Sequence, residues 1–118
     1  MKISIDMDGT MLKWPEFFTE FVIAMQARGH QVGVLTSRDN SDGKDRTESL
    51  MDRGIPKLDF YIGRNAQEQI EQIHQVPWKK NKMKELGIDF HFDDWGEFSI
   101  IELFSHHVDQ HPRIGNSR

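Results

Sequence analysis

Two aspartates stand one residue apart in the segment KISIDMDGT (residues 2–10), where an apolar strand is expected to end. Like charges at this spacing repel each other, and a strand end gains no stability from them. Asp6 and Asp8 therefore predict a positively charged partner, and a bound metal ion is the simplest one.

Apolar periodicity and turn residues predict strands that alternate with helices along most of the chain. The expected strands cover residues 2–7, 30–37, 58–63 and 88–92. The expected helices start at Pro15, at Ser41 or Asp42, at Ala66 and just before Met83, and a last helix lies within 93–104. The first four helices should end near Gly29, Gly54, Pro77 and Gly87. This alternation predicts an α/β fold with three layers, a mostly parallel sheet covered by helices on both faces.

Three of the expected strands end in acids or hydroxyls. These are Asp6 and Asp8, Thr36 and Ser37, and Asp93 and Asp94. The carboxyl ends of parallel strands lie at one edge of a sheet, so these side chains should meet there. Four carboxylates at one edge repel each other unless a cation joins them, and oxygen ligands without Cys or His suit Mg²⁺. Because Mg²⁺ is held by few carboxylates together with substrate phosphate, a phosphorylated substrate is expected.

Length and composition limit the classes of protein that fit. The 118 residues suffice for one domain, expected over residues 1–118, with a frayed C-terminal segment at about 105–118. A net charge of −4 argues against non-specific binding to nucleic acid or to an anionic membrane. The chain has no cysteine and no apolar run long enough to span a bilayer, which favours a cytoplasmic protein.

Four segments resemble, in order, the motifs of the haloacid dehalogenase (HAD) superfamily. They are IDMDGT (5–10), GVLTSR (33–38), WKKNKMKELGID (78–89) and FHFDDW (90–95). The resemblance covers residues 2 to about 95. It implies a Rossmann-like fold and Mg²⁺-dependent phosphoryl transfer through an aspartyl phosphate.

The resemblance also implies roles for individual residues. Asp6 would be the nucleophile, and Asp8 the general acid, whose backbone carbonyl also binds the metal. Thr36 would donate a hydrogen bond to a phosphoryl oxygen. Lys79 would neutralise the phosphate together with Asp6, and Lys80 and then Lys82 are its rivals for this role.

The last motif completes the expected metal site, which consists of Asp6, Asp8, Asp94 and Asp93. Asp94 would contact the metal, and Asp93 would support it as an outer partner. The remaining candidates for contact with the phosphate are Gly9, Thr10, Ser37, Arg38 and Lys80. For Arg38, binding of a second phosphate and simple exposure to water are both open.

The spacing between motifs leaves no room for a cap domain. Only a few residues separate Thr10 from the helix at Pro15, and residues 37–78 are already used by two helices and a strand. An open site favours hydrolysis over mutase chemistry, although a neighbouring subunit could act as the lid.

The sequence therefore predicts a capless Mg²⁺-dependent phosphatase that acts on a phosphate monoester, in a phosphorylated small molecule or a nucleotide. A nucleotide or polynucleotide-end phosphatase is an open alternative, and acidic net charge weakens its polynucleotide form. A non-catalytic domain that senses phosphate is the alternative from another class, and an oligomer is compatible with all of these.

Overall fold

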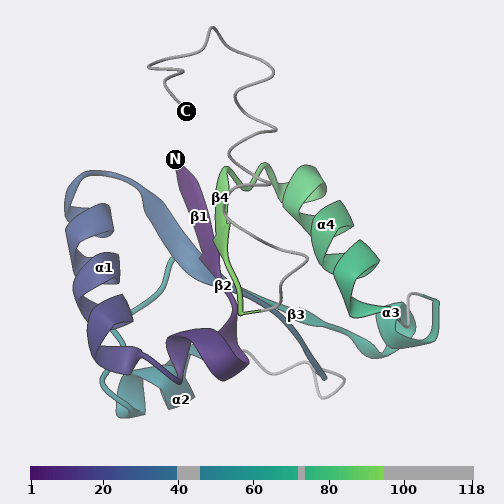
Figure 1. Ribbon diagram of the computed structural model, residues 1–118, viewed down its shortest axis with the longest axis horizontal. Coiled ribbons are helices and arrows are strands. Elements are labelled where there is room, and N and C mark those ends of the chain that lie inside the picture. Colours follow the sequence, from purple (N-terminus) through teal and green to yellow (C-terminus); the bar gives the residue numbers. More distant parts are fainter. Residues whose placement is uncertain (40–45, 72–73, 95–118) are drawn as a thin grey trace, which may run out of the picture.

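The computed structural model describes residues 1–39, 46–71 and 74–94 (Figure 1). The strands in these ranges are β1 (Lys2–Ile5), β2 (Gln31–Asp39), β3 (Phe60–Arg64) and β4 (Phe90–Phe92). The helices are α1 (Pro15–Ala27), α2 (Thr47–Asp52), α3 (Ala66–Glu71) and α4 (Gln75–Leu86). One irregular helical turn, η1 (Met7–Met11), follows β1 and leads toward α1.

The four strands form one sheet in the order β3-β2-β1-β4, and every neighbouring pair is parallel. The predicted α/β class with a parallel sheet is therefore confirmed for the described part of the chain. β1 lies between β2 and β4, so the ends of these three strands are neighbours at one edge. This is the edge at which the sequence places its acidic and hydroxyl side chains.

Helices cover both faces of this sheet, as predicted (Figure 1). On one face, Ile3 and Ile5 of β1 pack with Phe18 and Val22 of α1 in the larger apolar cluster. On the other face, Leu35 of β2 packs with two buried side chains of α4, Trp78 and Met83. Because side chains alternate along a strand, Ser4 between Ile3 and Ile5 faces the α4 side.

Several boundaries differ from the sequence prediction. β1 ends at Ile5, whereas the strand was expected to include Met7, and α4 starts at Gln75, well before Met83. β3 and β4 each start two residues later than expected.

Pro77 was expected to end a helix, but it lies in the first turn of α4, where a missing backbone N–H costs no hydrogen bond. β2 was expected to end at Ser37, but it continues to Asp39. Its register with β3 shifts between Leu35 and Asp39, so the added residues of the strand follow an irregularity in the pairing.

Several predicted features lie outside the described residues. They are the cap at Ser41 or Asp42, the last helix beyond Asp94, and the segment 105–118. Between β2 and α4, the described residues contain only α2, β3 and α3 as regular elements, which leaves the expectation of a capless chain in place. No helix in the described ranges is both long enough and apolar enough to span a membrane.

Candidate active site

The parallel register brings the acidic ends of β1 and β4 together. Ile5 pairs with Phe92, so Asp6 and Asp93 each come one residue after a paired position. The backbone N–H of Asp6 donates to the carbonyl of Phe92 at 2.8 Å, which continues the ladder past the end of β1. Two carboxylates from distant parts of the chain thereby become neighbours.

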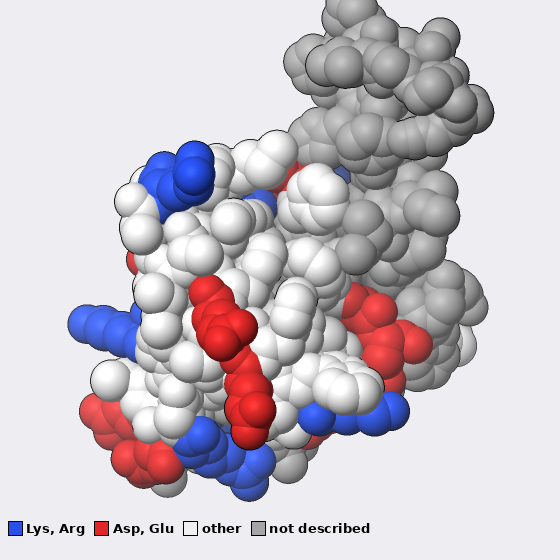
Figure 2. Space-filling model, turned by 60° about the vertical axis from the view of Figure 1, so that its left-hand side comes forward, with Lys and Arg blue, Asp and Glu red and all other residues white. Residues whose placement is uncertain are grey.

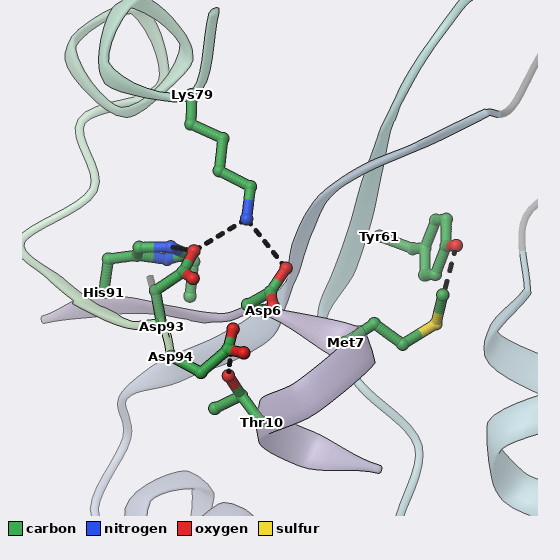
Figure 3. Close-up of polar contacts among 9 residues, drawn as sticks. Asp6, Met7, Thr10, Tyr61, Lys79, His91, Asp93 and Asp94 are labelled. Carbon is green, nitrogen blue, oxygen red and sulfur yellow. Dashed lines mark hydrogen bonds and ion pairs between the residues drawn. The ribbon is translucent and has the colours of Figure 1, made fainter. Parts of the chain in front are cut away.

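Lys79 of α4 joins these two carboxylates. Its Nζ lies 2.7 Å from Asp6 Oδ1 and 2.7 Å from Asp93 Oδ2 (Figure 3). The ammonium group is buried, and a buried charge of this kind persists only where it is paired and hydrogen-bonded. Lys79 is thus the lysine that the structure places at the strand ends.

The two rival lysines lie elsewhere on α4. Lys82 forms ion pairs with Glu68 at 2.9 Å and with Glu85 at 3.3 Å. The pair with Glu68 raises the pKa of Lys82. Burial raises the pKa of Glu68, but the hydrogen bond from the backbone N–H of Asn65 and the pair with Lys82 outweigh it, so the net change is a lowering. Lys80 is half-buried, one position beyond Lys79.

Asp94 lies against the turn η1. Thr10 Oγ1 donates to Asp94 Oδ1 at 3.4 Å (Figure 3). A Cβ atom at Gly9 would overlap the Asp94 carboxylate. Gly9 also has a φ of 79°, a backbone conformation that other residues adopt only under strain. The glycine of the first motif therefore both turns the chain and leaves space for the last acid.

Asp6, Asp93 and Asp94 form a carboxylate cluster, in which one oxygen of each side chain lies within 4.8 Å of one oxygen of each of the other two. Among these side chains and Lys79, three negative charges face one positive charge. Burial raises the pKa of Asp6 to about 6, Lys79 opposes this shift, and the charges of Asp93 and Asp94 add to it.

This carboxylate cluster fits a divalent cation. Its donors are all carboxylate oxygens, which Mg²⁺ prefers, and its charge is not balanced by Lys79 alone. The expected ligands Asp6, Asp93 and Asp94 are thus brought together. Asp8 is exposed on η1, and its carboxylate lies outside the cluster.

The remaining predicted residues lie on β2. Thr36 is buried and Ser37 is half-buried, both beyond Val34, the last residue of β2 that pairs with β1. The side chain of Arg38 lies outside the described part of the structure. Their predicted contacts with phosphate remain predictions.

The sequence analysis missed a buried polar pair beneath the site. His91 Nε2 lies 2.9 Å from Asp93 Oδ2, and His91 Nδ1 lies 2.7 Å from Ser4 Oγ. Burial lowers the pKa of His91, and the positive charge of Lys79 adds to this effect, while Asp93 opposes it. A signal was present, because Ser4 and His91 each stand two residues before an acid and so point to the same side of neighbouring strands.

Comparisons with known proteins give no assignment. A scan against protein-family models finds no match for this chain, and neither do searches of curated proteins and of solved structures.

We predict that Asp6→Asn stabilises the metal-free protein in neutral solution. A raised pKa means that ionisation of Asp6 costs folding free energy as the pH rises from 3.8 through about 6. The variant cannot ionise, and Lys79 keeps its contact with Asp93. Its free energy of unfolding should exceed that of the wild type by up to about 3 kcal/mol near neutral pH and match it toward pH 4. Urea unfolding with a chelator present measures this, and a difference independent of pH would contradict it.

We also predict that Mg²⁺ stabilises the wild-type protein against heat. A ligand at a hundredfold excess over its Kd adds about 2.7 kcal/mol to the free energy of unfolding. Asp94→Asn should remove most of this gain, because it takes one carboxylate from the cluster. Asp89→Asn is a matched control at the opposite end of β4, where Asp89 accepts from the backbone N–H of Lys2. Equal Mg²⁺ responses of the two variants in thermal melts would exclude Asp94 as a ligand.

Proposed function

We propose that this protein is a Mg²⁺-dependent phosphatase of the HAD type, which hydrolyses a phosphate monoester through an aspartyl phosphate. The observation that carries the proposal is the buried ammonium of Lys79, 2.7 Å from Asp6 and from Asp93 at the ends of two parallel strands. The resemblance requires an acid, a lysine and a further pair of acids at one site, and these are Asp6, Lys79 and the pair Asp93 and Asp94. The three-layer α/β architecture supports the Rossmann-like form of the fold.

In this proposal Asp6 attacks phosphorus. Lys79 holds Oδ1 of Asp6, so attack is assigned to Oδ2. The P–O bond to the substrate alcohol breaks as the bond to Asp6 forms, and Asp8 donates a proton to the departing oxygen. Water then attacks phosphorus with loss of its proton to Asp8, which releases inorganic phosphate and restores the Asp6 carboxylate.

Mg²⁺ would be held by the carboxylates of Asp6 and Asp94 and by the backbone carbonyl of Asp8. It would supply positive charge to offset the repulsion between an anionic substrate and an anionic nucleophile. The charge excess of the carboxylate cluster supports this part of the proposal. Exposure of Asp8 also suits a group that must exchange protons with water.

The net charge of −4 and the distribution of charge on the α1 side of the molecule both support a small substrate over a long polynucleotide. Lys and Arg side chains on the α1 side of the molecule stand apart, with acidic side chains between them (Figure 2). A polynucleotide would need a continuous basic surface to follow its backbone. A phosphorylated small molecule or a mononucleotide needs only the local charge at the site.

We predict that the purified protein hydrolyses p-nitrophenyl phosphate with Mg²⁺ and that Asp6→Asn abolishes this activity. Loss of a covalent nucleophile removes the reaction path and should lower kcat by more than about 10⁴-fold. Asp8→Asn should lower kcat by about 10²–10⁴-fold, as expected for loss of a general acid. Release of nitrophenolate measures the turnover of the wild type and of both variants.

The matched control Asp89→Asn should keep kcat within a factor of about two, because Asp89 lies at the other end of β4. Near wild-type turnover by Asp6→Asn would exclude the assigned nucleophile. A domain that only senses phosphate would show no turnover with or without Mg²⁺.

A further inference from the structure

Two polar side chains occupy the sheet face that α4 covers. Ser4 and His91 pair in register across β1 and β4, and both are fully buried. Around them this face is apolar, with Leu35, Trp78 and Met83 in its core cluster. Burying an imidazole and a hydroxyl costs free energy that an apolar pair would not, so their contacts matter more than their packing.

The hydrogen bonds of His91 fix its ring at both ends. Nε2 of His91 lies 2.9 Å from Asp93 Oδ2. Because this carboxylate oxygen is an acceptor, the hydrogen of the neutral ring lies on Nε2. Nδ1 is then the acceptor for the hydroxyl of Ser4, at 2.7 Å. The tautomer follows from these partners, and it makes His91 a donor aimed at Asp93.

Asp93 in turn receives two donors on one oxygen. Oδ2 accepts from His91 Nε2 at 2.9 Å and from Lys79 Nζ at 2.7 Å (Figure 3). The same ammonium reaches Asp6 at 2.7 Å. A chain of hydrogen bonds therefore runs from Ser4 through His91, Asp93 and Lys79 to the strand end that carries Asp6.

We propose that Ser4 and His91 are positioning residues that hold the Asp93 carboxylate in place, and through it the Lys79 ammonium against Asp6. A lysine side chain has four flexible carbons, so a single contact with Asp6 would leave its ammonium poorly fixed. Asp93 supplies the second contact, and His91 prevents that carboxylate from rotating away. This role rests on the proposed function only where it concerns the reaction. The fixing of Asp93 itself is independent of it.

Two similar substitutions separate positioning from packing. In His91→Gln the amide nitrogen comes close to the position of Nε2, so it can still donate to Asp93. In His91→Asn the amide nitrogen comes close to the position of Nδ1, so contact with Ser4 is possible, but Asp93 loses the donor that His91 supplies and keeps only Lys79 of the two. Both variants place a polar group of similar size in the same buried position.

We predict that His91→Asn lowers kcat for p-nitrophenyl phosphate and the affinity for Mg²⁺ by about 10–100-fold, whereas His91→Gln keeps both within about fivefold. Ser4→Ala should give an intermediate loss, because the ring then lacks one of its two anchors. Adding His91→Asn to Asp93→Asn should cost less than a further factor of about two, since the effect passes through Asp93. Turnover, calorimetric titration with Mg²⁺ and thermal melts measure these effects.

The outcomes decide between the possibilities. Equal losses in folded His91→Gln and His91→Asn would reduce His91 to a packing role, and wild-type values in both would remove the role entirely. A wild-type protein that binds Mg²⁺ without hydrolysing phosphate esters would contradict the proposed function, and the Mg²⁺ affinities of the two variants would then decide the positioning role. A wild-type protein that binds no Mg²⁺ would overturn the proposed function, and the thermal melts would then decide the positioning role: a larger loss of stability in His91→Asn than in His91→Gln supports it, and equal losses contradict it.

Discussion

The two ion pairs of Lys79 are the interaction on which the arrangement of the site depends. Removing an ammonium and two carboxylates from water costs several kcal/mol for each ion, and this cost is offset only at close range. At 2.7 Å on both sides, Lys79 requires β1, β4 and α4 to keep their relative positions. The neighbouring Trp78 packs α4 against Leu35 of β2, so the core that seats this helix also sets the reach of the lysine.

The two faces of the sheet contribute differently to this arrangement. The α1 side carries Ile3 and Ile5 in a larger apolar cluster, which supplies stability through buried area. The α4 side carries Ser4 and His91 at positions where apolar residues would pack at lower cost. The apolar α1 side therefore offsets the free-energy cost of the polar groups on the α4 side. Such an unequal contribution of the two faces is expected where a fold holds charged groups in fixed positions.

Much of this geometry follows from local sequence patterns. Alternation in residues 2–7 and 88–92 predicts two strands, and the acids that come next meet because parallel strands end at one edge. Helix geometry alone does not support the predicted preference for Lys79 over Lys82. Three residues are about 300° of helical rotation, so both lie within about 60° of one another on α4. Only the position of α4 sends Lys79 to Asp6 and Lys82 to Glu68.

Where the structure departs from the sequence prediction, the physical causes are similar. Pro77 predicts the end of one helix as readily as the first turn of the next, because both positions lack a need for its N–H. The roles of Ser4 and His91 do not follow from the strand pattern, because that pattern predicts only which positions face an apolar core. Their partnership depends on register, which the sequence of either strand alone does not determine.

The lysine and a metal ion serve different parts of the carboxylate cluster and are not alternatives. Figure 3 shows Lys79 approaching Asp6 from one side, while Asp94 and Thr10 lie on the other. Asp93 receives two donors, from Lys79 and His91, whereas the contact between Asp94 and Thr10 involves a neutral hydroxyl. The charge that remains to be balanced is therefore concentrated between Asp6 and Asp94, at the turn where Gly9 allows the Asp94 carboxylate to approach the backbone. A cation bound there would balance the remaining negative charge without displacing the ammonium of Lys79. The proposed reaction requires both positive charges at the site.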